Sequence, residues 1–561
     1  MLCRFRWVYC QLVYLRRCIP ARIRHALKQL PETLDETYER TLQEIHEQNW
    51  EYAHHLFEFV AVASRPLRVE ELAEFLAFDF NAGPTPTFVP DWRPEDPAQE
   101  VLSTCSSLLS IVKVHNSQVV EFSHFSVKEY LMSDRLSKSK DILSRYHVSM
   151  IPAHTIVAQA CIGVLLHPDK NVSRDSLESL PLVEYAALFW LEHARVEGVS
   201  AKTQDGMKRL FDPDEPHFAA WIWVHDPIKH FLHTSSYMES TIPPQPGGSA
   251  LHYAALFGMY NTVRFLVMER SQDVNACDWD KATSLHRASE RGFVEVSRFF
   301  LEHGADASAQ DKRMGTPFYY TSESGEVELT RLLLKHGADA AAKDDQERTP
   351  LHQASKLGVA QLLLKHGADP TAQDKLKSTP LHLASQIGSV EVTRLLLEHG
   401  VDAAVQDDRK RAPLHEALEG GHVEVAQLLL EHGADPTAQD ENKITPLHLA
   451  SQRGSVDVTR LLLEHGVDAA AQDDRKRTPL HEALEWGHVE VAQLLLEHGA
   501  DTTAQDEHKS NPLHLASKSG SVEVTQLLLE HGTDASAQSN TNQTVVQEAE
   551  AFEISNRLLC S

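Results

Sequence analysis

The second half of the chain repeats one short signature at a nearly fixed interval. Thr-Pro-Leu-His, or a close variant, ends at His252, His286, His352, His382, His415, His448, His481 and His514. Tyr319 occupies the missing position and Gln547 a tenth, degenerate one, and the intervals are 33 residues except for one of 34 and one of 30. A fixed period of this length is typical of stacked supersecondary units, and it predicts an α-solenoid with an extended surface.

The repeat that begins at Thr478 shows what each unit contains. Its threonine stands where a helix N-cap belongs, and Pro479 follows at the first helical position. Apolar residues then recur at helical spacing, Gly487 interrupts them, and a second helix begins near Val489. Gly499 ends that helix as a left-handed C′ glycine would. The pattern predicts a helix, a turn, a second helix and an extended finger.

The string TPLHEALEWGHVEVAQLLLEHGAD, which starts at Thr478, closely resembles the consensus of ankyrin repeats. The resemblance covers roughly residues 247–538, and one repeat cannot bury its own leucine face, so neighbours must stack. We therefore expect a mostly α fold, in which a winged-helix and helical N-terminal module precedes an ankyrin-repeat α-solenoid. We place about nine repeats and a degenerate C-terminal cap in residues 241–561.

Two features depart from the ankyrin pattern. The repeat beginning at Thr349 is three residues short, because LGVAQLLL stands where others have GHVEVAQLLL, so we expect its second helix to start late and to leave a kink or weak point. At the finger tip, where the family usually has glycine, six repeats have Lys281, Lys377, Lys410, Lys443, Lys476 and Lys509. Because a positive φ is unfavourable for lysine, we expect these turns to differ from the family geometry.

Residues 409–474 and 475–540 are near copies that differ at 14 positions. The differences include Gly420/Trp486, Asn442/His508, Ile444/Ser510, Gln452/Lys518 and Arg453/Ser519, which fall on fingers or near the end of a first helix. In ankyrin proteins these places form the concave face, so the variation indicates either a recognition surface or neutral drift. We predict a protein-binding face with Trp486 as its anchor, since aromatic residues dominate binding hot spots. Around it we place Ile387, Glu419, Ile444, Arg453, Lys476 and Arg477.

Composition narrows the possible partners. The net charge of −27 argues against nucleic acid, because phosphates need a basic surface. Seven scattered cysteines form no C-x-x-C pair, which argues against a zinc site or a disulfide framework, and no apolar run approaches the roughly 20 residues of a membrane span. We expect a protein ligand as partner, no membrane contact, and a cytoplasmic location with the nucleus as the alternative.

The first half is organised differently. Residues 1–48 read as amphipathic helices, and in residues 49–140 helices precede two alternating runs around His115, which predicts a β-hairpin and hence a winged-helix domain. Residues 141–240 read as a helical connector, with helices expected at 157–166 and 183–193.

Three strings of this half, LKQLPETLDETYERTLQEI, RPLRVEELAEFLAF and CSSLLSIV…VVEFSHFSVKEYLMS, resemble the segment that follows the nucleotide-binding core of NACHT proteins. These are STAND-type signalling ATPases related to NOD-like receptors. The resemblance implies the C-terminal part of a NACHT–ankyrin protein, with residues 1–48 as the end of a NACHT module and a winged helix like that of GPI inositol-deacylase. It also implies that His124 matches a histidine that contacts the β-phosphate of ADP; otherwise His124 is a structural residue.

Nucleotide binding in that family needs a G-x-x-x-x-G-K-[ST] loop, and no Gly-Lys-Ser or Gly-Lys-Thr occurs in this sequence. A nucleotide therefore becomes a partner only if an upstream P-loop domain exists. Most of the 33 histidines belong to two repeat positions, which predicts structural roles. The sequence thus predicts no metal, no cofactor, no catalytic residue and no enzyme. We expect a protein–protein interaction scaffold or sensor; the alternative is the sensor half of a NACHT-type switch.

Overall fold

The computed structural model describes residues 33–230 and 246–519, apart from 81, 84, 106–107, 116, 140–141 and 169–172, together with 527–528 and 531. The helices expected before residue 33 and the C-terminal cap lie outside the described residues. The chain forms two compact units. The first runs to Ala254 and includes Met259–Asp273; the second comprises Ala255–Gly258 and the chain from Val274 onward.

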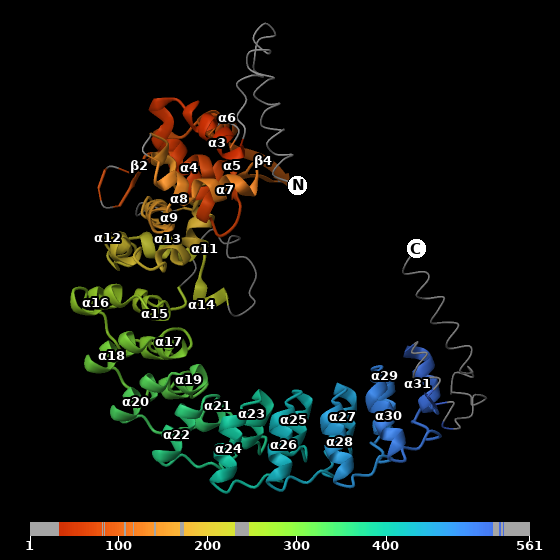
Figure 1. Ribbon diagram of the computed structural model, residues 1–561. Helices are drawn as coiled ribbons and strands as arrows, with labels where there is room; N and C mark the ends of the chain where they lie inside the picture. Colours follow the sequence, from red (N-terminus) through yellow and green to blue (C-terminus); the bar gives the residue numbers. More distant parts are fainter. Residues whose placement is uncertain are drawn as a thin grey trace, which may run out of the picture. The chain divides into compact units, whose positions relative to one another are not determined.

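The first unit begins with helices around a small antiparallel sheet (Figure 1). Its helices are α3 (Leu34–Gln43), α4 (Trp50–Val62), α5 (Val69–Glu74), α6 (Pro97–Cys105), α7 (Phe125–Leu131) and α8 (Asp134–Ser137). The sheet has the order β1 (Leu67–Arg68), β5 (Ser117–Phe122) and β4 (Leu109–Val114), with Ile111 opposite Val120. A second, two-stranded sheet joins β2 (Phe78–Asp79) to β3 (Thr87–Phe88). The predicted hairpin is confirmed, and His115 takes a left-handed φ of 54° in its turn.

Buried carboxylates hold this part together. Glu71 is fully buried and accepts hydrogen bonds from Arg65 at 2.7 and 2.8 Å and from the backbone N–H of Arg68 at 2.7 Å. Burial raises the pKa of Glu71, but these bonds outweigh it, so the pKa lies below its ordinary value. Glu74 pairs with Arg93 and accepts from the N–H of Leu182 at 2.5 Å, which ties α5 to the helices that follow.

The rest of the first unit is helical. Its helices are α9 (Met150–Leu165), α10 (Arg174–Glu178), α11 (Val183–Ala194), α12 (Ser200–Leu210), α13 (His217–Val224), α14 (Pro227–His230) and α16 (Tyr260–Met268), and α15 (Ala250–Leu256) begins in it. The helices expected at 157–166 and 183–193 correspond to α9 and α11. The core is aromatic, with the rings of Trp190 and Trp221 centred 5.6 Å apart and the Nε1 of Trp221 donating to the carbonyl of Ala187 at 3.0 Å.

The second unit is a series of helix pairs, drawn from green to blue in Figure 1. The pairs are α17 (Ser284–Glu290) with α18 (Val294–Glu302), α19 (Pro317–Ser324) with α20 (Val327–Lys335), α21 (Pro350–Gln353) with α22 (Leu357–Lys365), α23 (Pro380–Ile387) with α24 (Val390–Glu398), α25 (Pro413–Glu419) with α26 (Val423–Glu431), α27 (Pro446–Arg453) with α28 (Val456–Glu464), and α29 (Pro479–Glu485) with α30 (Val489–Glu497). α31 (Pro512–Ser519) follows. First helices stack on first helices and second helices on second helices.

The repeat signature has the local structure that the sequence predicts. Thr478 N-caps α29, Pro479 is its first residue, and Gly499 takes a φ of 85° after α30. The Nδ1 of His481 lies 2.8 Å from Thr478 Oγ1, and its Nε2 bonds the carbonyl of Ser510 in the next repeat at 3.3 Å. The same bridge to the following repeat occurs at His286, His352, His382, His415 and His448.

The short repeat differs from the prediction. Its second helix, α22, keeps the nine residues of its neighbours and starts soon after Thr349, so the expectation of a late start is wrong. The deletion falls on the first helix instead, because α21 has four residues and ends where Ala354 turns to an extended conformation. The second helix is kept since its leucines, such as the fully buried Leu363, close the core between repeats.

The finger tips also differ from the prediction. All six tip lysines adopt the left-handed conformation, with φ between 59° and 60°. The backbone therefore does not avoid the conformation that glycine would take there. Each lysine follows an aspartate such as Asp407, whose Oδ1 accepts the N–H groups of Arg409 at 2.9 Å and Arg411 at 2.8 Å, and these two bonds fix the turn.

The repeats from Thr379 to residue 510 alternate between two kinds, and we call each successive pair a module. One module consists of the repeats that begin at Thr379 and Ala412, and the next consists of those that begin at Thr445 and Thr478. In the second member of each module, His422 and His488 bond through Nε2 to the carbonyls of Gln386 and Gln452 in the first member, at 3.0 and 3.1 Å. The imidazole covers the left-handed glycine that ends the preceding first helix. A Cβ built on Gly454 would lie 2.4 Å from the Nδ1 of His488, so this position needs glycine.

Candidate protein-binding surface

A pocket of about 440 Å³ opens beside Trp486 in the second unit, and we call it the Trp486 pocket. It is lined by Asn442, Ile444, Gln452, Asp473, Asp474, Arg475, Arg477, Glu482, Glu485 and Trp486. These residues come from two successive fingers and from the first helices α27 and α29, so the pocket spans neighbouring repeats.

Trp486 stands at the C-cap of α29 and is 60% exposed. Among the described residues, no aromatic ring or cation stacks on its indole. Trp279, a finger residue that is 39% exposed, differs, because the Nζ of Lys312 lies 4.5 Å from the centre of its ring. An exposed indole without such a neighbour is a surface that a partner can cover.

Arg477 organises the charges of the pocket. Its Nε lies 3.1 Å from Glu482 Oε1, and its guanidinium also pairs with Glu485. Burial raises the pKa of Glu482, and the Coulomb attraction of Arg477 opposes that rise. Asp473 accepts the N–H groups of Arg475 at 2.8 Å and Arg477 at 2.7 Å. The guanidinium of Arg477 thus forms ion pairs with two carboxylates, those of Glu482 and Glu485, at the wall of the pocket.

The same arrangement of one arginine and two glutamates, which we call the ion set, occurs in the preceding module. Arg411 Nε lies 3.1 Å from Glu416 Oε1 and its guanidinium also pairs with Glu419, while burial raises the pKa of Glu416 as well. At the position of Trp486 this module has Gly420, which caps α25 in the same right-handed helical conformation. Neither the fold nor the ion set therefore requires a tryptophan at residue 486.

The structure brings together three of the seven residues predicted for the binding face. Ile444, Arg477 and Trp486 line the pocket. Arg453, at the end of α27, and Lys476, at the finger tip, are exposed but do not line it. Ile387, which is 48% exposed, and Glu419 belong to earlier repeats.

Sequence reasoning missed the acidic wall of the pocket. Glu482 and Glu485 stand one helical turn apart on α29, and the same spacing recurs at Glu416 and Glu419. Residues three apart share a helix face. This recurrence beside an arginine was the signal in the sequence that could have located the wall.

His124 lies at the junction of hairpin and helix in the first unit. It N-caps α7, where its Nδ1 accepts the N–H of Ser126 at 3.3 Å and lies 2.6 Å from Ser126 Oγ. Ser126 Oγ also lies 2.8 Å from the hydroxyl of Tyr38. These contacts give His124 a place in the packing of α7 against α3.

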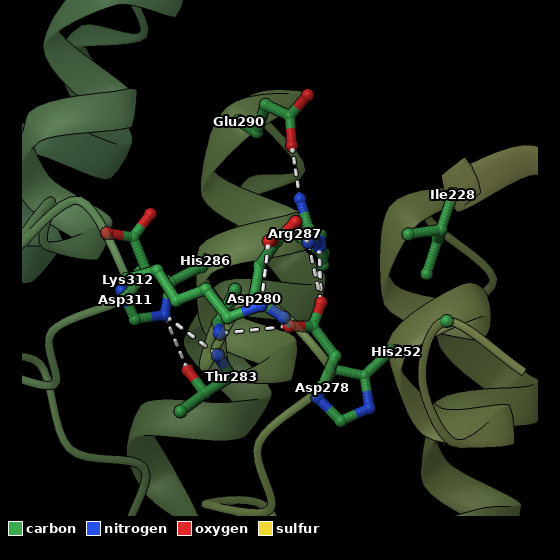
Figure 2. Close-up of polar contacts among 12 residues, drawn as sticks. Ile228, His252, Asp278, Asp280, Thr283, His286, Arg287, Glu290, Asp311 and Lys312 are labelled. Atoms are coloured by element: carbon green, nitrogen blue, oxygen red, sulfur yellow. Dashed lines mark hydrogen bonds and ion pairs between the residues drawn. The ribbon is translucent and has the colours of Figure 1, made fainter. Parts of the chain in front are cut away.

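A second charged cluster surrounds Arg287 on α17 (Figure 2). The guanidinium contacts Asp278 Oδ2 at 2.6 and 2.9 Å, Glu290 at 3.4 Å and Asp280 at 3.6 Å. Lys312 reaches Asp280 at 3.5 Å. Each charge here has a partner of opposite sign within the cluster, so these groups serve the cohesion of adjacent fingers.

The described residues contain neither a candidate metal site nor a helix that could cross a membrane. No group of three or more histidine, cysteine, aspartate or glutamate side chains is arranged to hold a metal ion there. None of the helices in the described part of the chain is long and apolar enough to cross a membrane.

Comparison with known families identifies the repeats. Residues 217–311, 308–374, 354–440 and 436–506 match ankyrin repeats in a three-copy arrangement, and residues 495–549 match ankyrin repeats in a many-copy arrangement. The matches cover more than half of the 561 residues. The chain is an ankyrin-repeat protein. Ankyrin repeats support a protein-interaction scaffold, and stacked repeats offer extended binding surfaces.

Residues 38–142 of this ankyrin-repeat protein match the winged helix domain of GPI inositol-deacylase, which confirms the predicted winged helix. The chain is also similar to "Azaphilone pigments biosynthesis cluster protein L" of Monascus ruber, with 29% identity over 292 residues. The aligned region is 49% of this chain, and it spans 60% of the length of that relative.

Proposed function

We propose that this ankyrin-repeat protein is a non-enzymatic interaction scaffold or sensor that binds a protein ligand at the Trp486 pocket. The observation that carries the proposal is that Trp486 is 60% exposed at a place where the preceding module has glycine. A large apolar side chain that the fold does not need is best explained by contact with a partner. Its site of action is the cytoplasm, with the nucleus as the alternative.

The surroundings of Trp486 suit a protein ligand. A pocket of about 440 Å³ accommodates side chains, and it combines an apolar residue, Ile444, with several charged ones. The proposal keeps Ile387, Glu419, Arg453 and Lys476, which do not line the pocket, as further contacts of the protein ligand. A central aromatic anchor with a polar margin is the usual composition of a protein–protein interface.

The test compares proteins captured by the full chain and by its Trp486→Gly variant. Each is used as bait in a lysate of cells that make the protein, and captured proteins are quantified by mass spectrometry. The proposal predicts a set of proteins that the wild type retains and the variant loses. The control is Trp92→Ala, which removes a tryptophan that is 48% exposed in the winged-helix region. An unchanged set with Trp486→Gly refutes the proposal.

A second candidate is the sensor half of a nucleotide-dependent switch. The match of residues 38–142 to a winged helix domain, ahead of the repeats, favours it. The two candidates differ in whether His124 takes part in ADP binding when an upstream P-loop domain is joined to the chain. In a calorimetric titration of that protein with ADP, the switch predicts binding that His124→Ala weakens while Trp486→Gly does not, whereas the scaffold predicts that neither variant changes it.

A further inference from the structure

The Trp486 pocket carries more negative than positive charge. Among the described residues, Glu482 and Glu485 form ion pairs with one guanidinium, that of Arg477, and Glu482 is largely buried. Arg475 also lines the pocket and acts on Glu482 at longer range, but the four lining carboxylates still outnumber Arg475, Arg477 and the nearby Lys443. On the facing finger, Asp474 pairs with Lys443 at 2.8 Å. The pairing therefore leaves an excess carboxylate on the α29 side of the pocket, beside the indole. A carboxylate that lacks its own counter-charge and is partly desolvated, as Glu482 is, is stabilised when a cation approaches it.

Two other tryptophans of the chain hold a cation over the indole ring. Lys312 lies over Trp279 at 4.5 Å and Arg145 lies over Trp50 at 5.1 Å. Within the described ranges, Trp486 has no cation over its ring. The indole face is electron-rich and attracts cations by about 0.5–2 kcal/mol, depending on their desolvation.

We propose that the Trp486 pocket takes an arginine or lysine side chain from a basic segment of the partner. The cation stacks on the indole of Trp486, and the carboxylates of Glu482 and Glu485 receive its N–H groups. This inference rests on the proposed function and names the chemistry of the ligand. The net charge of −27 adds long-range attraction for a basic segment.

The preceding module provides a matched comparison within the same chain. It keeps the ion set of Arg411, Glu416 and Glu419 but has Gly420 in place of the tryptophan. If acidic charge alone attracted the ligand, both modules would bind it. If the indole is required, only the module that carries a tryptophan binds the ligand.

The experiment measures fluorescence anisotropy of short labelled peptide pools with the full chain. The pools are degenerate and differ at one fixed central residue, which is arginine, lysine or citrulline, a neutral isostere of arginine. The proposal predicts that the arginine and lysine pools bind more tightly than the citrulline pool. Trp486→Gly weakens them by about 2- to 30-fold, as the range of cation–π energies implies. Gly420→Trp, added to Trp486→Gly, restores binding at the earlier module. A Cβ at Gly420 lies 2.5 Å from the His422 ring, so the imidazole must shift to admit it; beside Trp486 the corresponding His488 keeps its bond to Gln452.

Equal binding of the citrulline pool, or basic-pool binding that Trp486→Gly leaves unchanged, overturns the inference. Thermal unfolding of each variant shows whether it remains folded, and the gain of binding in the double variant does not depend on loss of stability. The outcome is separable from that of the proposed function. Suppose that Trp486→Gly loses proteins in the capture experiment while the citrulline pool binds as tightly as the basic pools. The proposed scaffold function is then supported, and the proposal of a cationic ligand is refuted.

Discussion

The Nε2 atom of His448 lies 3.0 Å from the carbonyl oxygen of Arg477, so a buried histidine of one repeat holds a pocket residue of the next. A carbonyl oxygen only accepts, so Nε2 carries the proton. The Nδ1 of His448 faces the N–H of Thr445 at 3.2 Å and must accept. The imidazole is therefore neutral, and burial lowers its pKa.

Replacing His448 by alanine should destabilise the repeats. The change leaves the carbonyl of Arg477 and the N–H of Thr445 without their histidine partner in a buried place, which costs about 1–3 kcal/mol for each unmet group. Urea unfolding followed by circular dichroism measures the effect. His465→Ala is the control, because its Nδ1 bonds only the carbonyl of Leu461 at an exposed helix end. Equal losses in the two variants would contradict the bridging role.

Stability of the second unit should fall as the pH drops below about 6.5. Burial lowers the folded-state pKa of the bridging histidines, which are His286, His352, His382, His415, His448 and His481. Below the unfolded pKa of about 6.5, the unfolded chain takes up protons that the folded chain refuses. The stability present above that pH is therefore lost as the pH falls toward the folded-state pKa values of these histidines.

Two largely buried glutamates, Glu416 and Glu482, act in the opposite direction because desolvation raises their pKa. Their contribution is present at low pH and is lost as the pH rises through the folded pKa. Each proton taken up on unfolding changes the free energy of unfolding by about 1.4 kcal/mol per pH unit. The free energy of unfolding, measured in urea from pH 5 to pH 8, shows whether the histidines or the glutamates contribute more to the pH dependence. Six histidines outnumber two glutamates, so a stability that is flat or higher at pH 5 refutes this account.

The short repeat should be the first place in the second unit to open. α21 has only four residues, so it makes fewer helical hydrogen bonds than α27, which has eight. Hydrogen exchange followed by mass spectrometry should show faster exchange in Pro350–Gln353 than in Pro446–Arg453, by roughly tenfold or more. Similar protection of the two helices would show that the deletion leaves no weak point.

Lys410→Gly should leave stability unchanged or raise it by up to about 1 kcal/mol. The left-handed φ of 60° costs a non-glycine residue roughly 1–2 kcal/mol, and the greater freedom of glycine in the unfolded chain offsets about half of that gain. Lys410→Val places a β-branched residue in the same conformation and should destabilise by about 1–2 kcal/mol. Thermal unfolding of both variants is the measurement. A higher stability of Lys410→Val would contradict the inference that the left-handed conformation is strained at this position.

The parts of the fold that depend on local chemistry could be predicted from the sequence. Thr478, Pro479 and Gly499 occupy the cap positions that their side chains and φ preferences specify. The winged helix followed from the alternating runs around His115. The response to the three-residue deletion could not be predicted, since it depends on which helix the stack between repeats needs more.

Part of the candidate site could be predicted as well. Trp486 and Ile444 stood out because they differ between near copies. Glu482 did not, because Glu416 occupies the same position in the other near copy, and its burial depends on the stacking of α29. The pairing of Lys443 with Asp474 joins two fingers, and no local pattern indicates which lysine reaches which acid.

The alternation of repeats, seen in the bonds of His422 to Gln386 and of His488 to Gln452, has a consequence for how such an array can change in length. Within residues 379–510, a gain or loss of one repeat would place two repeats of the same kind side by side and break this pattern of contacts. A gain or loss of two would preserve it. Unequal exchange of a 66-residue segment in the gene is therefore the structurally conservative route by which this protein can lengthen or shorten.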